Sequence, residues 1–266
     1  MTIRKPFAVF PLALVSPVGG NALANRAVTH LALPQYAGMR WQSNGNANLW
    51  VRGQFNGARR VDFMSLMAAN AQPGTTIRLR LGTSQAEVDG AAPYDSTALP
   101  FIAPARTEAS GLYHSHLELP SVVNATWWRI DISGHSGDFS ASALILGERL
   151  EPAHFYNRDR EIGFEDLGSF DISRNGVVAD TPGTVLRTLL FRLGWVDEAE
   201  WWQKWAPMGL RDASGGKQPV FWAFDPEPTV YRQSKTFLGF MARDLFKRGN
   251  DQGTRNSMDV QLRGIL

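Results

Sequence analysis

The chain has 266 residues, which is long for one hydrophobic core and comfortable for two domains. It contains no cysteine, so disulfides and thiolate metal sites are excluded. The formal net charge of +2 is too weak to recruit nucleic acid or an anionic membrane surface. No run approaches the ~18 apolar residues of a membrane span. With 44% hydrophobic and 20% charged residues, the composition indicates a soluble globular protein.

Residues 1–28 are expected to form an extended N-terminal arm or a first strand. Their basic head and apolar run resemble a secretory leader, but Pro6 and Pro11 interrupt that run. Residues 83–110 are expected to be a long loop, because they are rich in Ala, Pro, Asp and Ser. Alternating apolar residues predict strands at 48–55, 60–66, 75–81 and 111–119. Asn56–Gly57, between the first two, has the composition of a turn.

The clearest strand pattern lies at residues 125–132. Because side chains alternate across a strand, one face receives Trp128, Ile130 and Ile132, and the other receives Trp127, Arg129 and Asp131. The segment 133–137 is predicted to be a turn that leads into a strand at 138–147. Short strands at this spacing predict that residues 29–150 form a jelly-roll-like β-sandwich.

A domain boundary is expected near residue 150, followed by a smaller β-rich α+β domain over residues 151–266. A strand at 184–195 is largely apolar on both faces and is expected to be central in its sheet or covered on both sides. One short helix should follow, capped by Asp197, with an apolar stripe of Trp201, Trp205 and Met208. Further strands are expected at 217–224, 229–241 and 256–265. The predicted fold class is mainly β.

No motif in the sequence indicates catalysis. There is no Gly-x-Ser-x-Gly elbow, Walker loop or dinucleotide glycine fingerprint, and the carboxylates follow no glycosidase or nuclease pattern. His114 and His116 have the spacing of two metal ligands on a strand, but no third histidine lies nearby in the sequence. A surface pair or a hydrogen-bonded pair is favoured over a metal site, and we expect no enzyme activity, no metal and no cofactor.

Tryptophan is the more informative residue, with nine in the chain. The patterns place four of them in the core: Trp128, Trp195, Trp201 and Trp205. Three others are expected to face outward as platforms for sugar rings or for another subunit: Trp41, Trp50 and Trp127. A ligand of such a sandwich would lie on loops at one end. The candidate carbohydrate-binding residues there are Tyr36, Trp41, Tyr94, Asp95 and His135.

Several strand patterns resemble a known family. Residues 59–70, 76–82, 127–132 and 143–147 resemble the galactose-binding (discoidin-like) β-sandwich found in some tail proteins of tailed phages and prophages. The second half continues the likeness to phage tail proteins in residues 163–168, 187–193 and 230–239.

This resemblance implies a virion structural protein of a phage tail tip or baseplate, assembled in the host cytoplasm. Its implied partners are copies of itself, in a ring or trimer, and other tail proteins, with no nucleic acid and no membrane insertion. Two alternatives remain open: a carbohydrate-binding module for host-surface glycans and a hydrolase of cell-wall or capsule polymer. The first reading predicts that residues 1–28 lie along another subunit, and the hydrolase requires two facing carboxylates in a cleft.

Overall fold

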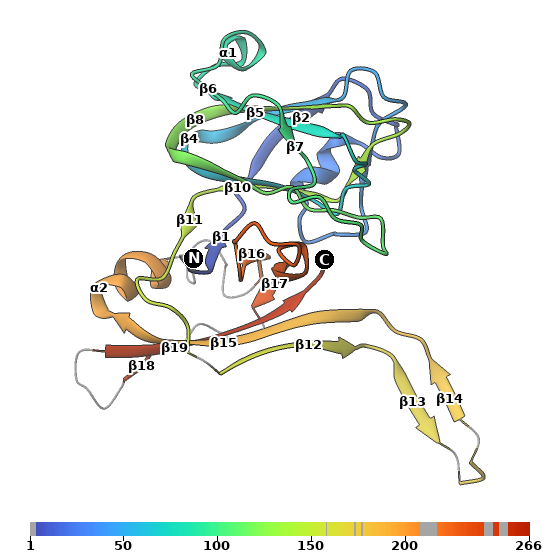
Figure 1. The fold of residues 1–266 in the computed structure, drawn as a ribbon, viewed down its shortest axis with the longest axis vertical. Helices are drawn as coiled ribbons and strands as arrows, with labels where there is room; N and C mark the ends of the chain where they lie inside the picture. Colours follow the sequence, from blue (N-terminus) through green and yellow to red (C-terminus); the bar gives the residue numbers. More distant parts are fainter. Residues whose placement is uncertain are drawn as a thin grey trace. The chain divides into compact units, whose positions relative to one another are not determined.

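A computed structural model describes residues 4–157, 159–172, 174–176, 178–207, 217–241, 247–249 and 255–266. The chain forms two compact units. Unit 1 consists of Met1–Glu151 and Val220–Thr236, and unit 2 consists of Pro152–Pro219 and Phe237–Leu266. The fold is mainly β, with short helices only (Figure 1). No helix in the described part of the chain is long and apolar enough to span a membrane.

The strands of unit 1 lie in antiparallel sheets. They are β1 (Phe7–Val9), β2 (Leu14–Gly19), β3 (Trp41–Gln42), β4 (Trp50–Met67), β5 (Thr76–Gly82), β6 (Tyr94–Asp95), β7 (Leu99–Pro100), β8 (Leu117–Ser133), β9 (Ser140–Ala141), β10 (Ala143–Gly147), β11 (Arg149–Leu150) and β16 (Val220–Ala223). The central path of the main sheet runs β10-β4-β8-β5-β6, with β2 beside β4 and β7 beside β5. β3 pairs with β9, and β1 lies between β11 and β16. The helical turns of this unit are η1 (Val28–Ala32), α1 (Gln85–Asp89) and η4 (Gln233–Lys235).

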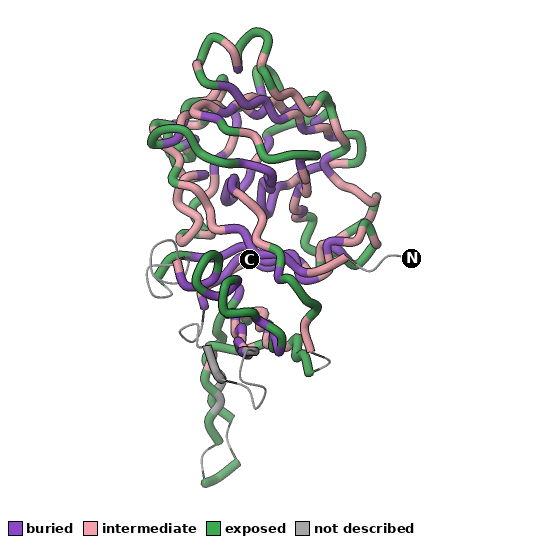
Figure 2. Tube along the Cα trace, turned by 90° about the vertical axis from the view of Figure 1, so that its left-hand side faces the viewer, coloured by how far each residue is buried: buried purple, intermediate pink, exposed green. Residues whose placement is uncertain are grey.

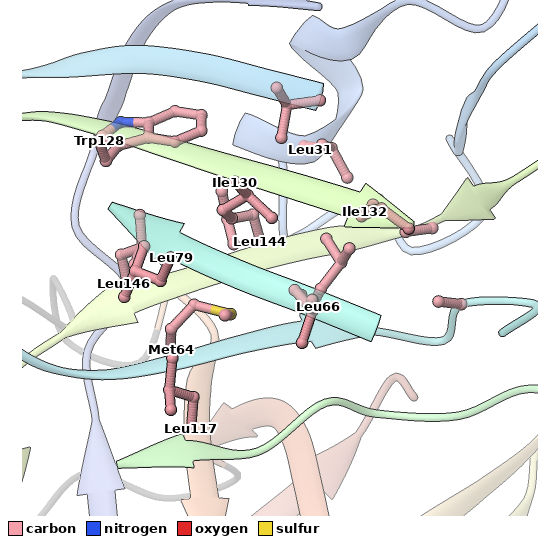
Figure 3. Packing of buried hydrophobic residues seen from close by; sticks show 14 of the residues in the cluster. Leu31, Met64, Leu66, Leu79, Leu117, Trp128, Ile130, Ile132, Leu144 and Leu146 are labelled. Carbon is pink, nitrogen blue, oxygen red and sulfur yellow. The ribbon is translucent and has the colours of Figure 1, made fainter. Parts of the chain in front are cut away.

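The two long strands β4 and β8 form the body of the sandwich. Their pairing shifts register between Gln54 and Arg59, next to Gly57, whose φ of +82° favours glycine. Such a bulge bends a strand, so the two halves of β4 contribute to different parts of the sandwich. Figure 3 shows the resulting core of buried side chains from β4, β5, β8, β10 and η1: Leu31, Met64, Leu66, Leu79, Leu117, Trp128, Ile130, Ile132, Leu144 and Leu146.

The alternation predicted at residues 125–132 is confirmed, because Trp128, Ile130 and Ile132 are all buried. Two predicted strand pairs are single strands instead. The expected turn at Asn56–Gly57 lies inside β4 as a bulge, and β8 contains the strand predicted at 125–132 together with the last three residues of the one predicted at 111–119. A bulge and a turn use the same residue types, so composition alone does not separate them.

Two further sequence predictions were wrong in detail. Residues 83–110 are not a plain loop, since they contain α1, β6 and β7. Five residues are too few to show helical periodicity, but Ser84 and Glu87 form a capping box at the start of α1. The strands on either side of 133–137 do not pair with each other, because β8 and β10 flank β4 on opposite edges.

The N-terminal segment belongs to the sheets of unit 1. Phe7, Ala8 and Val9 are fully buried in β1, and β2 pairs with β4 from Leu14 to Gly19. The ring of Phe7 packs edge-on against Phe63 of β4, with centroids 5.1 Å apart. Residues 7–19 are therefore held within their own unit, which is not the expected course along another subunit.

Unit 2 has the strands β12 (Arg160–Asp166), β13 (Ser169–Ile172), β14 (Val178–Thr181), β15 (Val185–Asp197), β17 (Thr236–Met241), β18 (Lys247–Gly249) and β19 (Arg255–Gly264). Its antiparallel sheet runs β17-β19-β15-β12, with β18 also beside β19. Among the described residues, β13 and β14 pair with each other alone, and they continue from β12 and β15 as a hairpin (Figure 1). A helix, α2 (Glu198–Glu200), leads into a π-helical turn, η2 (Trp201–Trp205).

Several predictions for the second half need correction. Trp195 is 45% exposed, because the register shift between Leu193 and Val196 breaks the alternation of β15 and Val196 is buried instead. β15 is central in its sheet, between β19 and β12, as one of the two alternatives predicted. It is not covered on both sides: Leu189, Phe191 and Leu193 are buried on one face, while the other face is partly exposed. Asp197 precedes α2 but makes no side-chain cap hydrogen bond. Of the predicted helix stripe Trp201 and Trp205 are buried, and Met208 lies outside the described residues.

The strand expected at 229–241 is also shorter than predicted. Residues 229–235 form turns and η4, and β17 begins at Thr236. Arg232, in this turn, is buried, and its guanidinium donates a hydrogen bond to the carbonyl oxygen of Ala103.

Candidate functional site

Two of the five predicted sugar-binding residues, Trp41 and His135, are buried around the ring of Phe139. The centroid of that ring lies 5.6 Å from Trp41 and 5.2 Å from His135. The His135 ring nitrogens lie 3.3 Å from Thr75 Oγ1 and 3.3 Å from the carbonyl oxygen of Asp138. Trp41 is fully buried, so the expectation of an open sugar platform at this residue was wrong.

The other three candidates lie elsewhere on unit 1. Tyr36 is 55% exposed in the loop after η1, and Tyr94 and Asp95 form β6. The register of β5 separates Tyr94 from His135, because Leu81 pairs with Tyr94 whereas Thr76 pairs with Ser133. Five residues of strand correspond to about 16 Å. The structure therefore does not bring Tyr94 and His135 into one site.

The loops at the His135 end are fastened to one another by Asp138. Its carboxylate accepts hydrogen bonds from Gly45 N at 2.7 Å and from Gln42 Nε2 at 3.0 Å. Its carbonyl oxygen accepts a third from Asn70 Nδ2 at 2.8 Å. These three hydrogen bonds join the loop that carries Asp138 to the segments of Gln42, Gly45 and Asn70.

A different surface gathers aromatic and charged side chains on the outward face of the main sheet. Opposed residues of antiparallel strands project to the same side, so the register arranges this face in three rows. The first row is Trp50, Asp131 and Arg78; the second is Arg52, Arg129 and Arg80; the third is Gln54, Trp127 and Gly82. We refer to these nine residues as the tryptophan–arginine face.

The second row places three guanidinium groups side by side, which is unfavourable without anions between them. Asp131 accepts from Arg80 Nη2 at 2.6 Å and from Arg129 Nη2 at 2.9 Å. Asp89, at the end of α1, accepts from Arg129 Nη1 at 2.7 Å and also from Arg52. Two carboxylates, one from β8 and one from α1, therefore hold the row in place.

The ionisation of these groups is fixed by the same contacts. Partial burial acts to raise the pKa of Asp89, but the hydrogen bond from Arg129 and the charge of Arg52 outweigh it and lower that pKa. Burial acts to lower the pKa of Arg129, and its hydrogen bonds to Asp89 and Asp131 raise it instead. Asp89 and Arg129 thus remain charged at neutral pH.

The indole of Trp50 lies within this charged setting. The guanidinium carbons of Arg129 and Arg52 lie 4.8 and 5.2 Å from its ring centroid, within the range of cation–π attraction. Trp50 and Trp127 are both partly exposed, as expected from their place in the sequence. The face therefore presents two aromatic surfaces beside hydrogen-bond donors and acceptors whose positions are fixed by ion pairs.

The alternation of residues 125–132 predicted three members of this face, and the outward orientation of Trp50 was also predicted. Arg52, Arg80 and Asp89 were not identified as partners. Arg78 and Arg80 alternate with apolar residues in the sequence, which is a signal for their side of the strand. The side chains that these arginines contact depend on strand register and on the position of α1. Neither can be derived from a local sequence pattern.

The histidine pair is hydrogen-bonded, as favoured from the sequence, although it lies just before β8 instead of on a strand. His114 Nδ1 accepts from Ala68 N at 3.0 Å, and His116 Nε2 lies 2.8 Å from Glu118 Oε1. Within the described ranges, no group of three or more histidine, aspartate or glutamate side chains is arranged to hold a metal ion.

Unit 2 presents a second unusual surface. The register of β12 and β15 puts Ile162 and Phe164 on the same face as the buried Leu189 and Phe191. Ile162, Phe164 and Val185 continue this face while being 47%, 75% and 57% exposed, and Arg187, which lies opposite Phe164, shares it. In Figure 2, the described residues of the hairpin formed by β13 and β14 are coloured mostly as exposed. There Ile172 pairs with Val178, and both side chains are more than half exposed.

No protein-family model matches the sequence, and no curated protein matches it. Among solved structures, the chain is similar to a chitosan-binding module of a chitosanase/glucanase from Paenibacillus sp. IK-5 (11% identity, 53% of this chain and 98% of that one, TM-score 0.37). It is also similar to a fucose-binding module of Streptococcus pneumoniae (9%, 52% and 95%, 0.37). A third is the first CBM32 module of a family 31 glycoside hydrolase from Clostridium perfringens (9%, 52% and 99%, 0.34).

Proposed function

We propose that unit 1 is a carbohydrate-binding module and that its ligand lies across the tryptophan–arginine face. The observation that carries the proposal is the order of the three rows: a partly exposed tryptophan, a row of ion-paired guanidiniums, and a second partly exposed tryptophan. Trp127 lies four residues from Asp131, the neighbour of Trp50, so the two tryptophan rows are about 13 Å apart.

The chemistry of the face suits a sugar. The C–H side of a pyranose is apolar and stacks on an indole, while its hydroxyls both donate and accept hydrogen bonds. Guanidinium groups supply donors, and Asp89, Asp131 and Gln54 supply acceptors. Because Arg52 and Arg129 are already held by ion pairs, little side-chain entropy is lost when a ligand binds.

The test is glycan-array screening of the full chain, followed by calorimetry with the best ligand. Trp50→Ala and Trp127→Ala should each weaken binding about tenfold or more, since a stacked ring contributes ~1–3 kcal/mol. The matched control is Trp202→Ala in unit 2, where the indole is 59% exposed and binding should not change. A wild-type chain without any glycan ligand, or binding that survives both substitutions, would refute the proposal. The proposed role breaks no covalent bond, so release of shorter sugars from the bound glycan would also contradict it.

A second function is favoured by a separate observation, the exposed apolar face of unit 2. The function implied by the resemblance to phage tail proteins is that of a virion structural component of a tail tip or baseplate, acting through self-association and contacts with neighbouring tail proteins. Exposed Phe164 and Val185 on a sheet face are typical of a surface that another chain covers. The two functions are compatible, because they use different units.

Mass spectrometry and immunogold labelling of purified tailed particles test this second function. The chain should be a stoichiometric component, and antibody should label one end of the tail. Tailed particles from the source strain that lack the chain would exclude it.

A further inference from the structure

β12 is an edge strand of unit 2 over its whole described length, Arg160–Asp166. It pairs with β15 on one side, and no described strand pairs with its other side. Natural edge strands are usually protected by proline, lysine, an inward charge or a bulge. The seven residues of β12 contain no proline or lysine, and the pairing with β15 continues without a register shift. The charged residues of β12 lie toward its two ends, and its centre, Ile162–Phe164, carries no charge, proline or bulge that would prevent another strand from pairing with it.

The two faces of β12 differ in chemistry. Arg160, Ile162, Phe164 and Asp166 project on the apolar face. Glu161, Gly163 and Glu165 project on the other face, where Glu165 accepts from Arg263 Nε at 2.9 Å. Charged residues thus lie at both ends of the apolar face, with two large apolar side chains between them.

We infer that β12 pairs in antiparallel fashion with β12 of a second copy of this chain, about a two-fold axis at Gly163. The inference rests on the self-association proposed for unit 2 and names the surface that carries it. Antiparallel pairing about a two-fold axis makes the interface self-complementary, so each contact occurs twice. The two sheets would then join as one continuous sheet through two edge strands.

The sequence of β12 selects both the partner and this register. With Gly163 opposite its own copy, Ile162 lies opposite Phe164 and Arg160 lies opposite Asp166, in both halves of the interface. Apolar residues thus meet apolar residues and opposite charges meet, which are the favourable cross-strand pairs. Moving the axis to Phe164 would place Ile162 opposite Asp166, and moving it to Ile162 would place Phe164 opposite Arg160. The central register is the one that pairs all seven residues and matches their chemistry.

One cross-strand pair in this register carries like charges, Glu161 opposite Glu165. The ion pair of Glu165 with Arg263 compensates it, because the guanidinium brings a positive charge to that position. Arg160 already donates to the hydroxyl of Tyr156 at 2.8 Å, and Asp166 Oδ1 accepts from Gly168 N at 2.8 Å. A guanidinium has five donors and a carboxylate has two oxygens, so both retain capacity for the pair across the interface.

Cysteine cross-linking of the full chain tests the register directly, because the native chain has no cysteine. In the inferred dimer, the two copies of residue 163 face each other with Cα atoms about 4.5–5.5 Å apart, which a disulfide spans. Gly163→Cys should therefore give a covalent dimer on mild oxidation. The matched control is Glu161→Cys on the same face of the strand, where the two copies lie four residues out of register, about 13 Å apart. The double variant Glu161→Cys/Glu165→Cys should cross-link again.

Charge reversal gives an independent readout by analytical ultracentrifugation. Arg160→Asp should weaken the dimer about tenfold or more, because it places two carboxylates opposite each other twice. Adding Asp166→Arg should restore the affinity, a result that a merely structural effect of the first substitution would not produce. The inference is overturned if the wild-type chain is monomeric at high concentration, if Glu161→Cys cross-links as fast as Gly163→Cys, or if the second reversal restores nothing. A chain that is found in tail particles but fails these tests retains its proposed function and loses this interface, and the glycan assays remain unaffected.

Discussion

His116 Nε2 and Glu118 Oε1 lie 2.8 Å apart, and this contact joins several segments of unit 1. Arg4 and Arg149 donate to the other oxygen of Glu118. The imidazole packs against Phe63, with ring centroids 5.1 Å apart. One carboxylate thus connects the N-terminal segment, β8 and the residue that begins β11.

The first prediction concerns the pH dependence of stability. Burial acts to raise the pKa of Glu118, but hydrogen bonds from His116 and Arg4 outweigh it and lower the pKa from 4.5 to about 2. Burial acts in the opposite direction on His116: it lowers the pKa of the imidazole and so favours the neutral form in the folded chain. In both cases the unfolded chain binds the proton first, so stability should be full above pH ~6.5 and decline as the pH falls towards 2.

The substitution Glu118→Gln should remove about 2 kcal/mol of unfolding free energy at pH 7. The lowering of the Glu118 pKa corresponds to about 3 kcal/mol of stability. Solvent screening of the partly exposed Arg4 reduces this contribution. The difference from wild type should disappear near pH 2. Urea unfolding at several pH values provides the measurement, with Glu148→Gln as control, since its exposed pair with Arg60 should contribute less than about 1 kcal/mol. Equal losses for both variants at pH 7 would show that the cluster has no special role.

The second prediction separates the two acidic partners of the arginines on β5. The Arg80 side chain is only 7% exposed and depends on Asp131, whereas Arg78 is 40% exposed and pairs with Asp95. Asp131→Asn should cost about 2–3 kcal/mol, because it leaves buried guanidinium charge without its anion. Asp95→Asn should cost less than about 1 kcal/mol. Chemical denaturation of the two variants decides the matter, and similar midpoints would mean that burial of Arg80 has no energetic consequence.

A third prediction tests the packing of Trp128 against β4. A Cβ added at Gly53 would lie 2.6 Å from Cζ2 of Trp128, which is fully buried, and 3.2 Å from the carbonyl oxygen of Val15. Gly53→Ala should therefore destabilise the chain by about 1–3 kcal/mol. Gly38→Ala is the control, because no atom lies within 4 Å of the added Cβ, and its effect should be neutral or slightly stabilising. Thermal unfolding monitored by tryptophan fluorescence measures both, and a neutral Gly53→Ala would show that the indole shifts freely.

Local alternation predicted the sides of the strands well and their extents poorly. Trp128, Ile130 and Ile132 are buried as expected, because the period of two is a property of each residue and its neighbours. The join at Gly57 was read as a turn, because glycine with positive φ serves both a turn and a bulge. Which of the two forms depends on the partner strand.

The candidate site illustrates the same division. The sequence predicted that Trp127, Arg129 and Asp131 lie on one face, since alternate residues of a strand project to the same side. It did not place Trp50 next to Arg129, because 79 residues separate them and only the β4–β8 register brings them together. Trp41 was misassigned for the same reason: its burial depends on Phe139, almost a hundred residues later. Tertiary register was the missing information in each case.

The last prediction concerns α1, which carries Asp89 to the tryptophan–arginine face. Ser84 Oγ accepts from Glu87 N at 3.3 Å, and Glu87 accepts in return from Ser84 N at 3.3 Å. A helix of five residues is too short to persist without such caps, so the position of Asp89 depends on this pair. Ser84→Ala should cost about 1 kcal/mol locally and reduce amide protection at Glu87. Because a displaced Asp89 no longer restrains Arg52 and Arg129, glycan affinity should fall as well, while the exposed control Ser121→Ala should change neither hydrogen exchange nor binding. Loss of protection at α1 with unchanged affinity would mean that Asp131 alone positions Arg129.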